Sequence, residues 1–352
     1  MKLKFCRTLA AMLCLSILLC LCGQTVFAEG TEVTDLSHYH TTVESAAGEL
    51  REQMTLRASP ITVYLALDEQ SDTVPRELFF GAFAHTGVPN QGDYLKWQCG
   101  GCSIDWNYEE QDGMYLYTLT YTVEYYTTAQ EEEAVDRAAA ELLEELDLED
   151  AGDYRKICTV YDYICQNVTY DHLGVALGDT KVYTAYGALI NGRAVCQGNA
   201  VLLYRLALAL GLDARFVAGI SRSAKHAWNI VKLGDRYYNL DSTWDAGAEE
   251  YEYFLQCDDS FAKHVREDTY STAEFCTAYP MADRDYWHIQ GDFDESGTVT
   301  DEDAIYLLWH TLFKEDYPLS QNGDVDCSGV VTDEDAIYLL WHTLFEEDYP
   351  LR

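Results

Sequence analysis

The segment NGRAVCQGNAVLLYRLALALG, residues 191–211, decides the fold class of this 352-residue chain. From Gln197 to Leu210 it is apolar nearly all round, which predicts a helix buried in the centre of a domain. Gly211 suits the end of that helix, because glycine readily adopts the left-handed conformation found there. Another helix is predicted over 157–168, and strands over 214–219, 227–233 and 236–241. The sequence therefore predicts an α+β domain with a central helix packed on an antiparallel sheet.

Cys196 stands at the predicted N-terminus of this central helix. The helix dipole there favours a thiolate, and the free backbone N–H is a candidate oxyanion donor. His226 begins the second predicted strand and Asp241 ends the third, with Gly234-Asp235 suited to a tight turn between them. Folding at that turn makes His226 and Asp241 neighbours. The carboxylate would then fix the imidazole tautomer, leaving the other ring nitrogen as a base for Cys196.

Four short motifs surround these three residues: YTAYGALI (183–190), AVCQGNA (194–200), HAWN (226–229) and DSTWD (241–245). With YDYICQNVTYD (161–171) and YFLQCDDSFAK (253–263), they resemble the transglutaminase-like core over about residues 150–270. The resemblance implies a papain-like fold, a catalytic triad of Cys196, His226 and Asp241, and a thioester intermediate. Hydrolysis of peptide or carboxamide bonds of proteins is the favoured prediction. Cross-linking by acyl transfer to amines remains an alternative, as does a silent, non-catalytic module that binds a cell-wall or plant-wall component.

Residues 291–319 and 323–351 are the same 29-residue unit, differing at four positions. Each unit begins with oxygen-bearing residues at the spacing of an EF-hand loop, with glycine at the sixth position and a helix after the loop. Position 7 contributes a backbone carbonyl. The predicted ligands of two structural calcium ions are Asp292, Asp294, Ser296, Thr298, Thr300 and Asp303 in the first loop, and Asp324, Asp326, Ser328, Val330, Thr332 and Asp335 in the second.

Two such loop-helix units without separate entering helices resemble the type I dockerin, a small all-α, EF-hand-like module. The resemblance covers residues 291–352 and implies binding to a cohesin module of a scaffold protein, as in cellulosome-like assemblies. Positions 10 and 11 of the loops, which commonly contact the cohesin in that family, are the acidic pairs 301–302 and 333–334 rather than the frequent Ser-Thr. This departure leaves the type of cohesin open.

The first 28 residues have the basic start, apolar stretch and small-residue end of a secretory signal peptide. Processing as a lipoprotein at Cys20 or Cys22 is an alternative. Removal of this segment leaves 20 basic against 60 acidic residues, a net charge of −40. Such a charge disfavours nucleic acid as a partner. No later segment has the length of a membrane span. We therefore expect a secreted, extracellular protein associated with a scaffold or cell surface.

Residues 29–148 are predicted to form an N-terminal α+β region, with a helix over 43–56, strands over 61–67 and 114–128, and an acidic helix over 130–146 whose Glu-rich face is solvated. Tyrosines alternate with threonines along 114–128, which favours a sheet core over a sugar-binding face. Cys99 and Cys102 suit either a small disulfide or half of a zinc site. Whether the region is a propeptide, a substrate-binding domain or an integral support stays open. The predicted parts are a signal peptide (1–28), the N-terminal region (29–148), the transglutaminase-like catalytic domain (149–288) and the dockerin (289–352).

Overall fold

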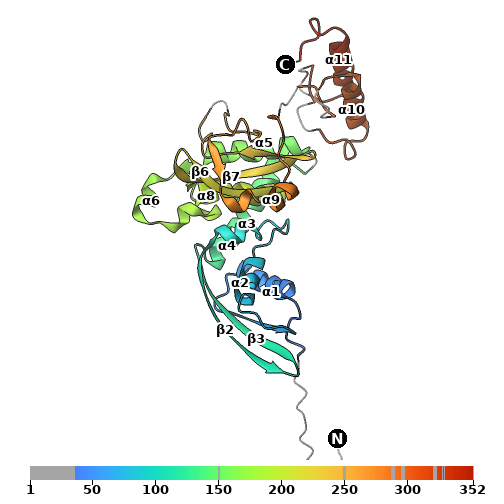
Figure 1. Cartoon of the computed structure of the whole chain (residues 1–352). Coiled ribbons are helices and arrows are strands. Elements are labelled where there is room, and N and C mark those ends of the chain that lie inside the picture. The colour runs from blue at the N-terminus through green and yellow to red at the C-terminus, as the bar shows by residue number, and fades with distance from the viewer. Residues whose placement is uncertain are drawn as a thin grey trace, which may run out of the picture. The chain divides into compact units, whose positions relative to one another are not determined.

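The computed structural model describes residues 36–149, 151–248, 251–286, 290–294, 298–319, 323–326, 328 and 330–351. The predicted signal peptide lies outside the described residues. From His38 onward the chain forms one unit with a mixed α+β fold of helices and sheets (Figure 1). None of the helices in the described part combines the length and apolar character that crossing a bilayer demands.

The N-terminal region contains a three-stranded antiparallel sheet in the order β1-β3-β2. Its elements are α1 (Val43–Thr55), β1 (Ile61–Leu67), α2 (Val74–Gly81), α3 (Asp93–Trp97), β2 (Cys99–Gln111) and β3 (Met114–Tyr125). Tyr117 and Tyr121 of β3 are fully buried beneath α1 and α2, so the tyrosine stripe belongs to a core, as predicted. Cys99 and Cys102 flank a bulge in β2 and are free thiols.

A second core surrounds helix α8 (Cys196–Ala209), which is buried at every position from Gly198 to Leu208. A four-stranded antiparallel sheet in the order β8-β7-β6-β9 packs against this helix. The strands are β6 (Ala214–Ser221), β7 (Ala224–Leu233), β8 (Arg236–Leu240) and β9 (His264–Arg266). The other elements of this region are α5 (Asp153–Asn167), β4 (Thr169–Tyr170), α6 (His172–Leu177), η1 (Thr180–Tyr183), α7 (Ala185–Leu189), β5 (Arg193–Ala194), η2 (Asp268–Tyr270) and α9 (Ala273–Ala278). The predicted central helix on an antiparallel sheet is thus present.

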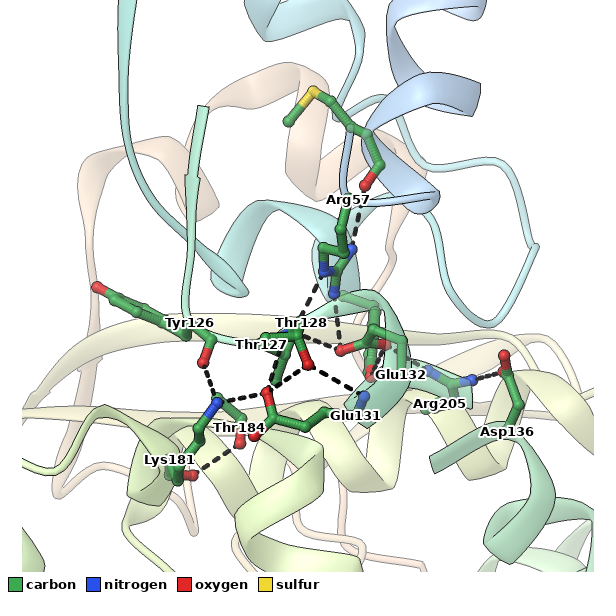
Figure 2. A network of polar contacts seen from close by, with 12 residues as sticks. Arg57, Tyr126, Thr127, Thr128, Glu131, Glu132, Asp136, Lys181, Thr184 and Arg205 are labelled. Atoms are coloured by element: carbon green, nitrogen blue, oxygen red, sulfur yellow. Dashed lines mark hydrogen bonds and ion pairs between the residues drawn. The ribbon is translucent and has the colours of Figure 1, made fainter. Parts of the chain in front are cut away.

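Helix α4 (Ala129–Leu146) joins this second core through Val135, Ala139 and Leu142. Its Glu-rich face was predicted to be solvated, but Glu132 is only 7% exposed. Figure 2 shows why a carboxylate is stable there: Glu132 forms ion pairs with Arg57 at 2.8 Å and with Arg205 at 3.3 Å. It also accepts hydrogen bonds from Tyr94 and Thr127. Buried charges are tolerated when they are paired and hydrogen-bonded in this way.

Two nearly identical units form the C-terminal region, and each contributes one helix, α10 (Asp301–Leu312) and α11 (Asp333–Leu344). Leu307 and Leu339 are fully buried in the small core between them. Each helix begins directly after a threonine cap, Thr300 or Thr332. The reason is a capping box, in which Thr300 or Thr332 bonds the first turn and an aspartate three residues later bonds back.

Candidate active site

Cys196 is the first residue of α8, directly after the cap residue Val195. Its backbone N–H lies in the first turn of the helix, where amides have no partner within the helix. The start of the helix is fixed by a hydrogen bond from Val195 N to Val182 O at 2.9 Å. Gly198 permits this approach, because a Cβ there would lie 2.7 Å from that same carbonyl oxygen. The thiol therefore sits at a rigid, electropositive helix end, as predicted.

The side-chain amide of Gln197 hydrogen-bonds two backbone carbonyls. It donates to the carbonyl of Trp97 at 2.7 Å and to that of Tyr183 at 3.3 Å. Trp97 is the last residue of α3, so the amino acid next to Cys196 is bonded to the N-terminal region of the chain.

The structure brings together the three residues that the sequence selects. His226 of β7 and Asp241, which directly follows β8, are joined by a hydrogen bond of 2.6 Å between Nε2 and Oδ2. The opposite ring nitrogen, Nδ1, is left for Cys196, whose nearby sulfur favours the protonated imidazole. Burial lowers the pKa of His226, but hydrogen bonds with Asp241 and Cys196 outweigh it and raise the pKa to about 9. A proton is thus held on the ring beside the sulfur.

Asp241 is almost fully buried and is surrounded by donors. Its Oδ1 atom accepts hydrogen bonds from the backbone amides of Thr243 at 3.0 Å and Trp244 at 3.2 Å. Burial acts to raise the pKa of Asp241, but hydrogen bonds from His226 and His264 prevail and leave it below its ordinary value. The carboxylate is therefore kept ionised in a site from which water is excluded.

His264 of β9 is a residue of this site that the sequence analysis missed. Its Nε2 atom lies 2.9 Å from Oδ2 of Asp241, the same oxygen that binds His226. The recognised motif ends at Lys263, one residue earlier, and the three-residue strand carries no periodic pattern that would single this histidine out.

Other residues of the motifs serve the architecture. Asn229 donates to the carbonyl of Ala200 at 2.9 Å and so ties β7 to α8. Asp245 accepts a hydrogen bond from the hydroxyl of Tyr161 at 2.7 Å and two more from the amides of residues 252 and 253. These bonds fix the positions of His226 and Asp241 relative to the thiol.

The surface beside the thiol is aromatic and basic. Tyr170 of β4 is 39% exposed, and burial together with the nearby Cys196 raises the pKa of its hydroxyl. On the side of the imidazole, the Trp244 ring lies 5.4 Å from that of His226. The guanidinium of Arg222 lies 3.9 Å from the centre of the Trp244 ring.

His226, Asp241 and His264 also have the residue types of a metal site, with one ligand atom of each within 4.8 Å of the others. Ligand atoms around tetrahedral zinc lie about 3.3 Å apart, given metal bonds of about 2.0 Å. Here both imidazoles are closer than that to one carboxylate oxygen, at 2.6 and 2.9 Å. The arrangement fits hydrogen bonds better than metal ligation.

The C-terminal loops bring several of their predicted calcium ligands together. Carboxylate oxygens of Asp292, Asp294 and Asp303 lie within 4.8 Å of one another, and the same holds for Asp324, Asp326 and Asp335. Asp303 and Asp335 are fully buried. The hydroxyls of Thr300 and Thr332 act as helix caps, and Ser328 donates to Asp324 and Asp326. Thr298 and Val330 precede their helices in the loops. Ser296 lies outside the described residues.

Part of the chain is similar to known proteins. Residues 140–242 match the model of the transglutaminase-like superfamily. Over 119 residues the chain is 27% identical to the kyphoscoliosis peptidases of Homo sapiens and Mus musculus. These matches cover 30% of this chain but only 18% of the length of the relatives. The matched part therefore carries a transglutaminase-like core domain, of a superfamily whose members are typically cysteine peptidases or acyltransferases.

Two solved structures are also similar. A crystal structure of a TGase is 18% identical, with 78% of this chain and 77% of that chain covered and a TM-score of 0.31. A proposed cysteine protease from Cytophaga hutchinsonii is 16% identical, with 48% of this chain and 69% of that chain covered and a TM-score of 0.27.

Proposed function

We propose that the protein is a cysteine enzyme that acts on peptide or carboxamide bonds of proteins through a thioester on Cys196. The observation that carries this proposal is the single imidazole of His226, which contacts both the Cys196 thiol and the buried Asp241 carboxylate. A thiolate paired with an imidazolium is the activated form of a catalytic cysteine.

In the proposed reaction, the Cys196 sulfur attacks the carbonyl carbon, and the resulting oxyanion is stabilised by the backbone N–H of Cys196. The C–N bond breaks, and the proton on Nδ1 of His226 passes to the departing amine. In the second half, Nδ1 takes a proton from the attacking water. The C–S bond then breaks to release a carboxylic acid. Asp241 remains ionised throughout and orients the ring.

We favour water over a lysine amine as the acceptor because the site mouth is basic. Arg222 stacks on Trp244, which contacts the catalytic imidazole. A protonated lysine of a second protein would be repelled by this guanidinium charge. Water experiences no such repulsion.

The test incubates the full chain with a protein substrate and a primary-amine probe and follows the products by mass spectrometry. Hydrolysis gives cleaved peptides, or glutamate in place of glutamine, without probe incorporation. Incorporation of the amine would show a cross-linking enzyme instead. A Cys196→Ser variant is the control, and products that are unchanged in this variant would refute the triad.

We further propose that the C-terminal region binds two structural calcium ions and docks onto a cohesin module of a scaffold outside the cell. Three clustered carboxylates in each loop repel one another, and a hard divalent cation with oxygen ligands offsets that repulsion. Exposed apolar residues of α10 and α11, Ile305, Leu308, Ile337 and Leu340, line a groove of about 400 Å³. Contiguous exposed apolar surface of this kind favours a protein partner.

A further inference from the structure

His264 is completely buried, yet it takes no part in the reaction described above. Its side chain is 0% exposed, and its ring stacks on Phe261 with centroids 3.9 Å apart. The rings of Trp244 and Trp228 lie 4.6 and 5.1 Å away. A polar ring in such an apolar enclosure costs free energy unless its hydrogen bonds are made. Among the described residues, the side chain that hydrogen-bonds its ring is that of Asp241.

The hydrogen-bond partners determine the tautomer of His264. Nε2 must carry a hydrogen, because the oxygen that it contacts belongs to an ionised carboxylate. Nδ1 is buried and has no hydrogen-bond partner among the described residues. A cationic ring would place a second N–H there without an acceptor, which is more costly than a bare lone pair. The hydrogen on Nε2 is therefore directed at Asp241.

Both imidazoles donate to the same atom, Oδ2 of Asp241, at 2.6 Å from His226 and 2.9 Å from His264. The positive end of the His264 N–H dipole thus lies beside the proton that Asp241 holds on His226. It stabilises the carboxylate and opposes the positive charge of the catalytic ring. A carboxylate shared between two donors attracts each of them less strongly than it would attract one.

We propose that His264 is a positioning residue, which holds Asp241 in place and divides the hydrogen-bonding capacity of its carboxylate between two rings, thereby limiting the basicity of His226. The inference rests on the proposed function, since it assigns His226 as the base. The proposal predicts that His264, a residue outside the triad, sets the upper pH limit at which the His226 imidazolium persists.

Other titratable groups also face this cluster. Around Asp241 and His226 these are Cys196 of α8, Tyr161 and Cys165 of α5, and Asp245 in the loop after β8. Tyr253 faces His264, and its hydroxyl contacts the cations Arg222 and Lys263. All of these groups remain when His264 is substituted. A change in the titration of His226 therefore reports the loss of the His264 N–H donor.

The test uses the full chain with histidine labelled at Cε1, so that the His226 titration is followed by NMR without any substrate. In His264→Phe, a ring of similar size without a donor, the His226 midpoint should rise by about one pH unit. His264→Gln restores an N–H near the position of Nε2 and should titrate like the natural protein. Phe261→Leu is the control for packing, since it loosens the enclosure but keeps the donor.

An unchanged or lowered midpoint in His264→Phe, with only a lower melting temperature, would overturn the proposal and reduce His264 to a packing residue. So would a shift of equal size in Phe261→Leu. This readout is independent of turnover. If the protein neither cleaves nor modifies any substrate while the titration shifts as expected, the proposed function fails and the coupling of the two histidines stands.

Discussion

Arg57 and Glu132 form an ion pair of 2.8 Å with side chains only 3% and 9% exposed, although 75 residues separate them in the sequence. Through Glu132 this pair reaches Arg205 in the C-terminal half of α8, the helix that begins with Cys196. The network in Figure 2 therefore connects the N-terminal region to the helix that carries the nucleophile.

The first prediction concerns this network. Glu132→Gln should lower the free energy of unfolding by about 3 kcal/mol, because the buried guanidinium of Arg57 loses its carboxylate partner and that of Arg205 keeps only Asp136. Denaturant unfolding followed by circular dichroism measures the change. The neighbouring Glu133→Gln is the matched control, since Glu133 pairs with Arg137 at the surface and its loss should cost about 0.5 kcal/mol or less. Equal effects of the two substitutions would contradict the role given to Glu132.

The second prediction concerns the reactivity of Cys196. At pH 6, iodoacetamide should label Cys196 at least about tenfold faster than Cys276, which is exposed. Peptide mapping by mass spectrometry measures both rates in one sample. His226→Ala should remove the difference. Labelling of Cys196 that is no faster than in the denatured protein would leave the chain without an activated thiol.

The pH dependence of catalysis provides a third prediction. His226 has its pKa raised to about 9, so kcat/KM should fall on the alkaline side near that pH as the imidazolium loses its proton. Asp241→Asn removes the charge that supports the proton, and the alkaline limb should move down towards the ordinary histidine value. A limb that stays at the same pH in this variant would show that Asp241 does not act on His226.

Stability should also depend on the protonation of His226. Its pKa is higher in the folded protein than in the unfolded chain, so this stabilisation is complete below about pH 6.5 and is lost as pH rises through about 9. The loss amounts to at most about 3 kcal/mol. Unfolding measured at intervals from pH 6 to 10 should show the decline in the natural protein. His226→Gln should lack it, and an equal decline in that variant would assign it to another group.

The fifth prediction concerns calcium. Excess chelator should unfold residues 291–352 and abolish binding to a panel of type I cohesin modules, while hydrolysis of a small substrate continues. Asp303→Asn combined with Asp335→Asn should have the same effect in the presence of calcium, because these buried aspartates belong to the carboxylate clusters. The exposed pair Asp316→Asn and Asp348→Asn is the control. Cohesin binding that persists in chelator would exclude the proposed module.

Much of the fold could be predicted because the central helix is apolar on all sides and its neighbours have regular periodicity. Strand β2 escaped prediction for the opposite reason: it is an edge strand, largely exposed and polar, and is defined only by its pairing with β3. His226 and Asp241 could be placed together from one hairpin turn. His264 could not, since its position depends on pairing between β9 and β6, which are distant in the sequence.

The contacts of α3 determine what proteolytic removal of the N-terminal region would do to the candidate active site. Asp93 pairs with Arg215 of β6 at 2.6 Å, and the carbonyl of Trp97 holds Gln197 beside the nucleophile. Proteolytic removal of the N-terminal region would leave the largely buried guanidinium of Arg215 without its counter-ion and would loosen Gln197, the residue next to the thiol. We therefore expect the N-terminal region to stay attached in the working protein, because its removal by proteolysis would disturb the candidate active site instead of releasing it.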